Sequence, residues 1–152
     1  MIDMKKAESF AEGLAKREEE DIVLFRQGVP GFEHLKRYVL FRMDEQLPFY
    51  CLQAADEAAV QFLVVDPFLF YPQYEFELSK TVQSELNIRS EDDVQIFCIV
   101  SGAADFKRAT LNLMAPIVLN VETRDAQQVI LHESNYKTKH PLWPDQPKGE
   151  EA

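Results

Sequence analysis

The sequence has few cysteines, few glycines and no long apolar run, and each shortage argues against a class of protein. The two cysteines, Cys51 and Cys98, each lie inside an apolar run, where a thiol usually packs as a small hydrophobic side chain. Five glycines are too few for a glycine-rich phosphate-binding loop, and the Gly-Val-Pro-Gly turn at 28–31 lacks the Lys-Ser or Lys-Thr pair of such a loop. No stretch approaches the ~20 apolar residues of a membrane-spanning helix, and the first residues do not resemble a secretion signal. We therefore expect reduced structural cysteines and a cytoplasmic protein that contacts no membrane.

Basic residues are also in short supply relative to acidic ones. The chain has 16 Lys and Arg against 26 Asp and Glu, which gives a net charge of −10. Long-range repulsion of phosphate then disfavours direct nucleic-acid binding, whereas a basic protein would be attracted. A second interpretation stays open, in which the acidic excess only keeps the protein in solution.

What the sequence does have is enough hydrophobic residues for one compact core. Its 152 residues are 46% hydrophobic and include 11 Phe and 5 Tyr, which is too aromatic for a disordered chain. Short runs rich in β-forming residues alternate with turn residues, and they predict strands at 21–25, 38–42, 49–53, 60–65, 94–100, 117–121 and 128–132. Runs that are apolar at consecutive positions, such as 62–65 and 96–100, indicate strands covered on both faces.

The pattern predicts an all-β fold: a small antiparallel β-barrel-like domain with one or two short helices. Ser79 is placed to cap one helix, in which Val82 and Leu86 share a face before Asn87 ends it. We expect residues 1–20 to form a partly helical or disordered arm, 21–143 the domain, and 144–152 a flexible tail rich in Pro, Lys and acid.

Catalytic motifs are not apparent in the sequence. The three histidines lie in separate segments, no cysteine has a metal-site partner nearby, and no serine lies in a Gly-x-Ser-x-Gly context. Alternation would place Glu75 and Glu77 on one face of a strand around Phe76, so a small acid–base enzyme that uses this pair stays an alternative. A structural β module that oligomerises through a sheet edge is another. We expect no enzyme activity, no cofactor and no metal ion.

The aromatic run at 68–76 suggests both core packing and partner binding. Phenylalanine is usually buried, but aromatic side chains beside acids also form protein-binding patches. One arrangement would satisfy both functions, with Tyr71 and Tyr74 facing solvent and Phe68, Phe70 and Phe76 facing the core.

Several blocks of sequence, in one order, resemble a known family. They are Gly-Val-Pro-Gly-Phe-Glu at 28–33, Pro-Phe-Tyr-Cys-Leu-Gln at 48–53, Asp-Pro-Phe at 66–68, Tyr-Glu-Phe-Glu-Leu at 74–78, Asp-Val at 93–94, Asn-Leu-Met-Ala-Pro-Ile-Val-Leu-Asn at 112–120, Gln-Val-Ile-Leu at 128–131, and Tyr136 with His-Pro-Leu at 140–142. Together they resemble the FliW family of bacterial flagellar assembly factors over roughly residues 22–142. The charged, helix-like stretch at 7–20 departs from the short strand with which that family usually begins.

The resemblance implies a small β-barrel-like fold and two protein partners. These are CsrA, an RNA-binding translational repressor, and flagellin, the filament subunit. In the family, flagellin can take FliW away from CsrA, and the freed CsrA then represses translation of flagellin mRNA. Such a switch requires linked binding equilibria and no active site.

Two sets of residues are our hypotheses for the two partner sites. Negative charge would bind CsrA and repel RNA, and aromatic and apolar residues near four aromatic positions would receive an amphipathic flagellin helix. The predicted CsrA contacts are Glu75, Glu77, Glu91, Asp92 and Asp93, and the predicted flagellin contacts are Phe32, Phe68, Tyr71 and Tyr74.

Overall fold

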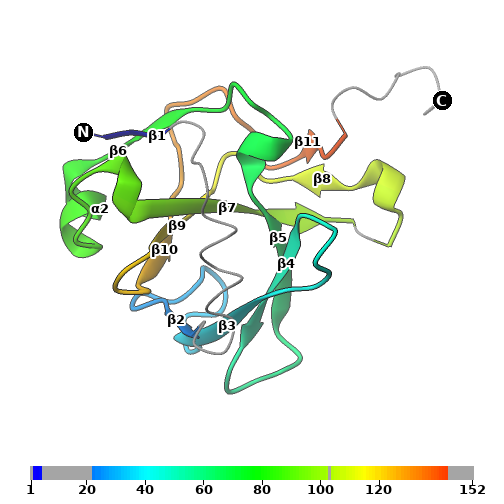
Figure 1. Cartoon of the computed structure of the whole chain (residues 1–152), viewed down its shortest axis with the longest axis horizontal. Coiled ribbons are helices and arrows are strands. Elements are labelled where there is room, and N and C mark those ends of the chain that lie inside the picture. The colour runs from blue at the N-terminus through cyan, green and yellow to red at the C-terminus, as the bar shows by residue number, and fades with distance from the viewer. Residues whose placement is uncertain (1, 5–21, 103, 144–152) are drawn as a thin grey trace.

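The computed structural model describes residues 2–4, 22–102 and 104–143, and all of its strands except β1 and β6 belong to one strongly bent antiparallel sheet (Figure 1). The order of strands along this sheet is β10 (Ala126–Gln128), β9 (Ile117–Asn120), β7 (Val94–Ser101), β5 (Gln61–Val65), β4 (Phe49–Ala54), β3 (Arg37–Arg42) and β2 (Ile22–Leu24). Two short strands, β8 (Thr110–Leu111) and β11 (His140–Pro141), extend it from β7. A separate ribbon pairs β1 (Ile2–Met4) with β6 (Phe76–Leu78).

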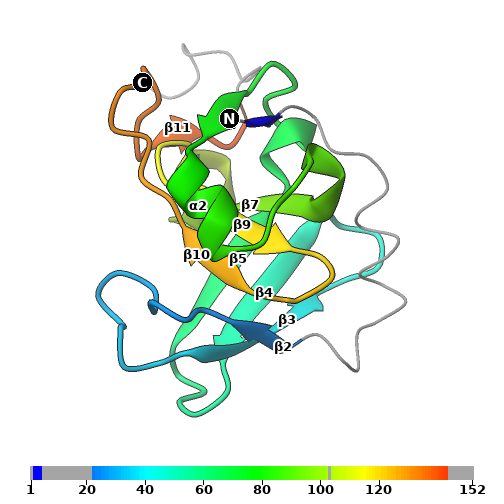
Figure 2. The same cartoon turned by 90° about the vertical axis from the view of Figure 1, so that its left-hand side faces the viewer.

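The two ends of the large sheet approach one another, so the sheet forms a nearly closed barrel (Figure 2). The Leu24 N–H on β2 donates to the carbonyl of Arg124, beside β10, over 2.9 Å. Leu24 and Asp125 form a parallel bridge, and Arg26 adds an ion pair to Asp125 at 3.1 Å. Closure satisfies backbone groups that an open edge would expose, and it confirms the predicted β-barrel-like fold.

Two core clusters explain the consecutive apolar residues of the central strands. On β7, Ile96 packs into one cluster and the adjacent Phe97 into the other, because successive side chains point to opposite faces. On β4, Phe49 and Tyr50 divide in the same way. The prediction that these strands are covered on both faces is therefore confirmed.

The predicted short helix is α2 (Lys80–Glu85), beside β6. The Ser79 Oγ accepts a hydrogen bond from the Val82 N–H at 3.2 Å, and Asn87 ends the segment with φ of 56°. Val82 and Leu86 are both buried, as their shared face predicts. Three short 3₁₀ helices complete the described structure: η2 (Pro67–Leu69), η3 (Glu91–Asp93) and η4 (Phe106–Arg108).

The strand predicted at 128–132 is wrong in its bounds. The tight β9–β10 connection, in which Arg124 has φ of 67°, starts the return strand at Ala126, two residues earlier. Apolar residues 129–131 follow the strand and make only scattered bonds, from the Val129 N–H to the Pro116 carbonyl and from the Leu131 N–H to the Met114 carbonyl. Their side chains pack against the core, and hydrophobicity alone does not distinguish such packing from pairing in a sheet.

The termini are described only in part. Residues 2–4 of the predicted N-terminal arm form β1 on the edge of β6, and the rest of that arm lies outside the described residues, as does the predicted tail at 144–152. No described helix has the length and apolarity needed to cross a bilayer. Both cysteines are free and buried, as predicted, and burial raises the pKa of both thiols.

Candidate protein-binding surfaces

Four of the predicted acidic residues lie exposed around β6 and η3. Glu75 and Glu77 flank the buried Phe76, so alternation places both carboxylates on the solvent side as predicted. Glu91 and Asp92 are exposed on η3. Strand β1 pairs with β6 and also contacts η3, so the two acidic segments share one neighbour. We call Glu75, Glu77, Glu91 and Asp92 the acidic edge.

Asp93 does not belong to this exposed set. Its Oδ2 accepts hydrogen bonds from the N–H groups of Arg89 at 3.0 Å and Ser90 at 3.2 Å, which is one half of a capping box. Its carboxylate therefore stabilises the start of η3. The spacing from Ser90 to Asp93 is itself a sequence signal for this role, and it was missed.

A groove of about 510 Å³ adjoins the acidic edge. One wall is formed by residues 75–77 and Ser79, and the other by residues 129–134. Glu75, Glu77 and Glu133 are the charged residues among those that line it, together with His132. The groove is open to solvent. Catalytic carboxylates usually lie in enclosed pockets, so the exposure of Glu75 and Glu77 gives the acid–base alternative no support.

Two of the four residues predicted to contact flagellin are buried. Tyr74 is only 2% exposed and Phe68 only 1%, and both belong to the core. The Tyr74 Oη donates to the Leu113 carbonyl at 2.7 Å, and burial raises the pKa of this hydroxyl. A turn closed by the Tyr74 N–H and the Tyr71 carbonyl breaks the alternation on which the prediction depended.

The other two predicted aromatic residues lie apart. Tyr71 is half-buried and its Oη donates to the Pro141 carbonyl, so it joins η2 to β11. Phe32 packs edge-on against Phe62, with ring centroids 5.6 Å apart, and it contacts the other core cluster. The four residues therefore form no common surface.

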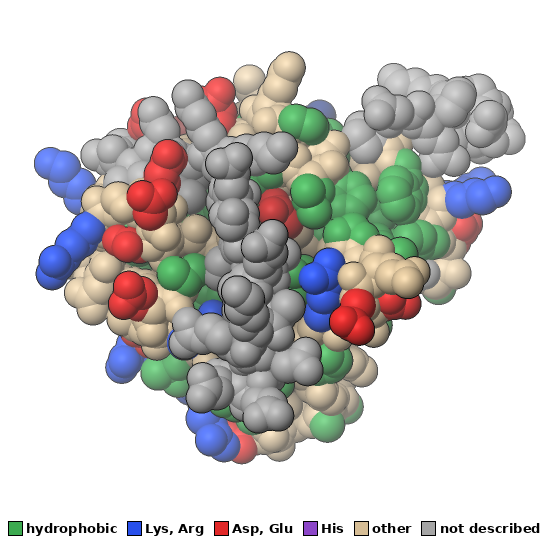
Figure 3. All heavy atoms as spheres, viewed as in Figure 1, with side chains coloured by type: hydrophobic (Ala, Val, Ile, Leu, Met, Phe, Trp, Pro, Cys, Tyr) green, Lys and Arg blue, Asp and Glu red, His purple; other side chains and the backbone are tan. Residues whose placement is uncertain are grey.

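The exposed aromatic surface lies elsewhere, around η4 and the end of β11. Phe106 and Trp143 stack edge-on at 5.5 Å, Phe70 lies 5.6 Å from Trp143, and Phe49 lies beneath, 5.1 Å from Phe106. The Trp143 Nε1 donates to the Phe106 carbonyl at 2.9 Å, which fixes the indole in place. Figure 3 shows hydrophobic side chains gathered over the η4 end of the molecule.

Two aliphatic side chains lie beside these rings. Leu69 is 56% exposed next to Phe70, and Met43 is 58% exposed. The Met43 N–H donates to the Phe49 carbonyl, so the two residues are cross-strand neighbours on one face. We call Met43, Leu69, Phe70, Phe106 and Trp143 the aromatic patch. The sequence did not predict this patch, because its members come from four separate segments. The one signal in the sequence was that the aromatic residues Phe106 and Trp143 lie in charged segments.

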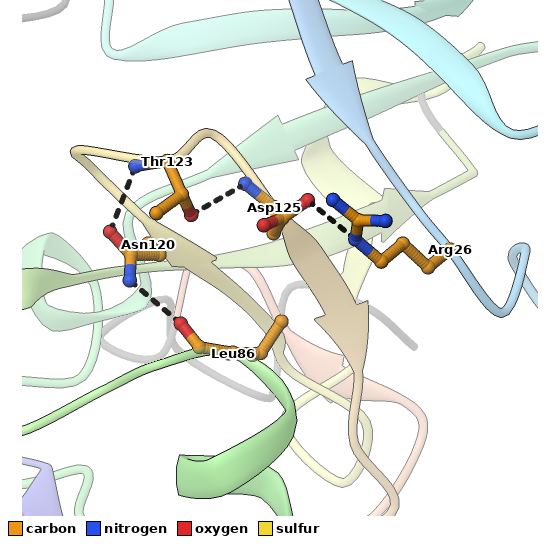
Figure 4. Close-up of polar contacts among 5 residues, drawn as sticks. All are labelled: Arg26, Leu86, Asn120, Thr123 and Asp125. Atoms are coloured by element: carbon orange, nitrogen blue, oxygen red, sulfur yellow. Dashed lines mark hydrogen bonds and ion pairs between the residues drawn. The ribbon is translucent and has the colours of Figure 1, made fainter.

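Two buried polar residues, Asn120 and Asp125, join α2, the β9–β10 turn and the segment after β2 (Figure 4). Asn120 on β9 donates from Nδ2 to the Leu86 carbonyl at 2.7 Å, and its Oδ1 accepts from the N–H groups of Glu122 and Thr123. This one side chain therefore joins the end of α2 to the β9–β10 turn. Asp125 continues the connection to β2 through Arg26, also visible in Figure 4.

Comparison with known proteins agrees with this architecture. The family model described as FliW protein matches residues 6–142. The chain belongs to the FliW family. The flagellar assembly factor FliW of Bacillus subtilis is 41% identical over 124 residues, covering 82% of this chain and 87% of that relative. A Geobacillus relative of the same name is 44% identical over 128 residues, covering 84% and 88%.

A solved structure supports the fold directly. The crystal structure of a flagellar assembly factor FliW superposes with a TM-score of 0.79 at 43% sequence identity, and covers 85% of this chain and 90% of that one. Within the described ranges, no three His, Cys, Asp or Glu side chains come close enough together to hold a metal ion.

Proposed function

We propose that this chain is a cytosolic flagellar assembly factor that binds CsrA and flagellin in alternation and catalyses no reaction. The observation that carries the proposal is the acidic edge, where four carboxylates from two segments that both contact β1 are exposed on a protein of net charge −10. A basic RNA-binding protein is complementary to such a surface. Family membership supports the flagellar role, because the relatives share the name flagellar assembly factor.

Antagonism of CsrA follows from charge and does not require the RNA groove to be covered. A bound domain that carries a net charge of −10 lowers the electrostatic attraction between CsrA and phosphate through space. The effect is strongest within a Debye length, ~8 Å at physiological salt, so the acidic edge nearest to CsrA contributes most.

For flagellin, the exposed aromatic patch replaces the four predicted residues. An amphipathic helix binds by placing its apolar face on exposed hydrophobic side chains, and Leu69, Phe106 and Trp143 offer such a surface. Figure 1 shows the η4 end and the β6 end on opposite sides of the molecule. Two partners at these places exclude one another only if binding of one lowers the affinity for the other through the fold.

A competition titration tests the proposal. CsrA is titrated into the purified full chain by calorimetry, and flagellin is then added while release of CsrA is followed by size-exclusion chromatography. We expect CsrA to form a saturable complex with this chain, and flagellin to release CsrA from that complex. Absence of binding to both proteins would refute the proposal, and a mass that rises with concentration in their absence would favour the oligomerising module instead.

A further inference from the structure

The groove beside β6 lies between this strand and the irregular segment at 129–134, which follows β10. Strand β6 pairs with β1 through one edge, in the register Met4 to Phe76 and Ile2 to Leu78. Their ribbon has two strands, so β6 has no second strand neighbour among the described residues. The Glu75 N–H already donates to Tyr136 Oη at 3.2 Å, and the Leu78 carbonyl accepts from Gln83 Nε2 at 2.9 Å. A peptide that lay in the groove would therefore meet β6 between these two bonds.

The opposite wall also has backbone N–H and carbonyl groups that could bond to a ligand. The Val129 and Leu131 N–H groups donate inward, to the carbonyls of Pro116 and Met114. Because successive backbone groups of an extended segment point to opposite sides, the Ile130 N–H and carbonyl point away from these partners. Ile130 lies on the groove, and its side chain is 40% exposed.

Side chains in the groove define the chemistry of its occupant. The apolar residues that line it are Phe76, Val129, Ile130 and Leu131. Negative charge comes from Glu75 and Glu77 on one wall and from Glu133 on the other. None of the residues that line the groove is Lys or Arg. An extended segment presents apolar and polar side chains alternately, so one face can contact Ile130 while the other places basic groups near these carboxylates.

We propose that this groove binds an extended segment of a partner protein that carries alternating apolar and basic residues, and that the segment adds as a strand to the edge of β6. Main-chain hydrogen bonds then provide affinity, and the glutamates on the two walls select for Lys or Arg. The five positions from 75 to 79 span roughly 16 Å, enough for a segment of similar length. This inference rests on the proposed function, because it takes CsrA as the partner protein that supplies the segment.

The main experiment measures CsrA binding to full-length variants. We expect Glu77→Lys and Glu133→Lys each to raise the Kd for CsrA about tenfold at low salt, with a smaller effect at high salt. Glu45→Lys, at an exposed site in the β3–β4 turn, makes the same charge change away from the groove and serves as the control. Unchanged affinity in both groove variants, with CsrA still bound by the wild type, would overturn the inference and leave the proposed function intact.

A second pair of variants distinguishes strand addition from contact by side chains alone. Ile130→Ala removes the side chain, and Ile130→Pro removes both the side chain and the backbone donor. We expect the proline variant to bind CsrA more weakly than the alanine variant, and equal affinities would overturn strand addition. If thermal melting shows that the proline variant is unfolded, protection of the wild-type Ile130 amide from hydrogen exchange on CsrA binding supports strand addition, and lack of protection overturns it.

The groove is also testable without CsrA. A capped peptide of alternating Lys and Val is titrated into the isotope-labelled full chain, and amide chemical shifts are followed by NMR. Shifts concentrated in residues 75–79 and 129–134 support the inference even if the wild type fails to bind CsrA, which would refute only the proposed function. A peptide that shifts no groove amide at millimolar concentration, together with a wild type that ignores CsrA, would overturn both.

Discussion

Replacing Asn120 with alanine should destabilise the whole fold, because this buried side chain satisfies backbone groups of two segments. The Leu86 carbonyl, on a buried residue, loses a donor at 2.7 Å, and leaving it without a partner costs about 2 kcal/mol. The N–H groups of Glu122 and Thr123 also lose their acceptor, but both residues are exposed and water can replace it at about 0.5 kcal/mol each. We therefore expect Asn120→Ala to lower the free energy of unfolding by about 3 kcal/mol, a large part of the roughly 5–15 kcal/mol of a typical domain.

Urea denaturation followed by circular dichroism measures this loss. The midpoint should fall while the slope of free energy against urea stays unchanged, since the same surface is exposed on unfolding. Thr123→Ala is a matched control in the same turn, because it removes only the bond that the Asp125 N–H donates to the Thr123 Oγ1, and it should cost about 1 kcal/mol. A loss below about 1 kcal/mol for Asn120→Ala would refute the argument that this residue joins α2 to the β9–β10 turn.

Three further predictions concern the aromatic residues and the buried ionisable groups. Tyr74→Phe should lower the free energy of unfolding by about 1–2 kcal/mol, because its buried hydrogen bond is lost, and it should leave the affinity for flagellin unchanged. A loss of flagellin affinity in the folded variant would show that Tyr74 contributes to binding. Phe106→Ala combined with Trp143→Ala should weaken flagellin binding at least about tenfold in calorimetry, whereas Ile22→Ala, at an exposed apolar site on β2, should not; equal effects would refute the aromatic patch. Burial raises the pKa of Cys98 and Tyr74 above their unfolded values, so the unfolded chain loses these protons first. The contribution of these two groups to stability should therefore be constant below about pH 8 and fall above it. Urea midpoints measured across this range test the sign, and stability that rises with pH there would contradict it.

The parts of the fold that depend on near neighbours in the chain were predictable. Ser79 caps α2 because its side chain reaches an amide three residues ahead, and that relation is visible in the sequence. Glu75 and Glu77 share the solvent side of Phe76 because strand side chains alternate. The capping role of Asp93 was equally local, and its spacing from Ser90 would have shown it.

The errors occurred where the chain turns or where distant segments meet. Tyr74 was expected to face solvent, but the preceding turn changes the side to which later residues point, so counting positions along the run no longer predicts their direction. Apolar residues at 129–131 look like a strand, yet their partners for pairing are set by the register of β9 and β10. Neither register nor turn geometry follows from hydrophobicity alone.

By itself, the sequence determined the all-β class, the family resemblance, the acidic character and the residues of the acidic edge, because composition and alternation are properties of single segments. Only the tertiary structure decided that Phe106 lies against Trp143, 37 positions away, and that residues 75–77 and 129–134 line one groove. Both surfaces depend on contacts between segments that are distant along the chain. The physical reason is that exposure and pairing are set by which segments pack against one another, and that is a property of the whole folded chain.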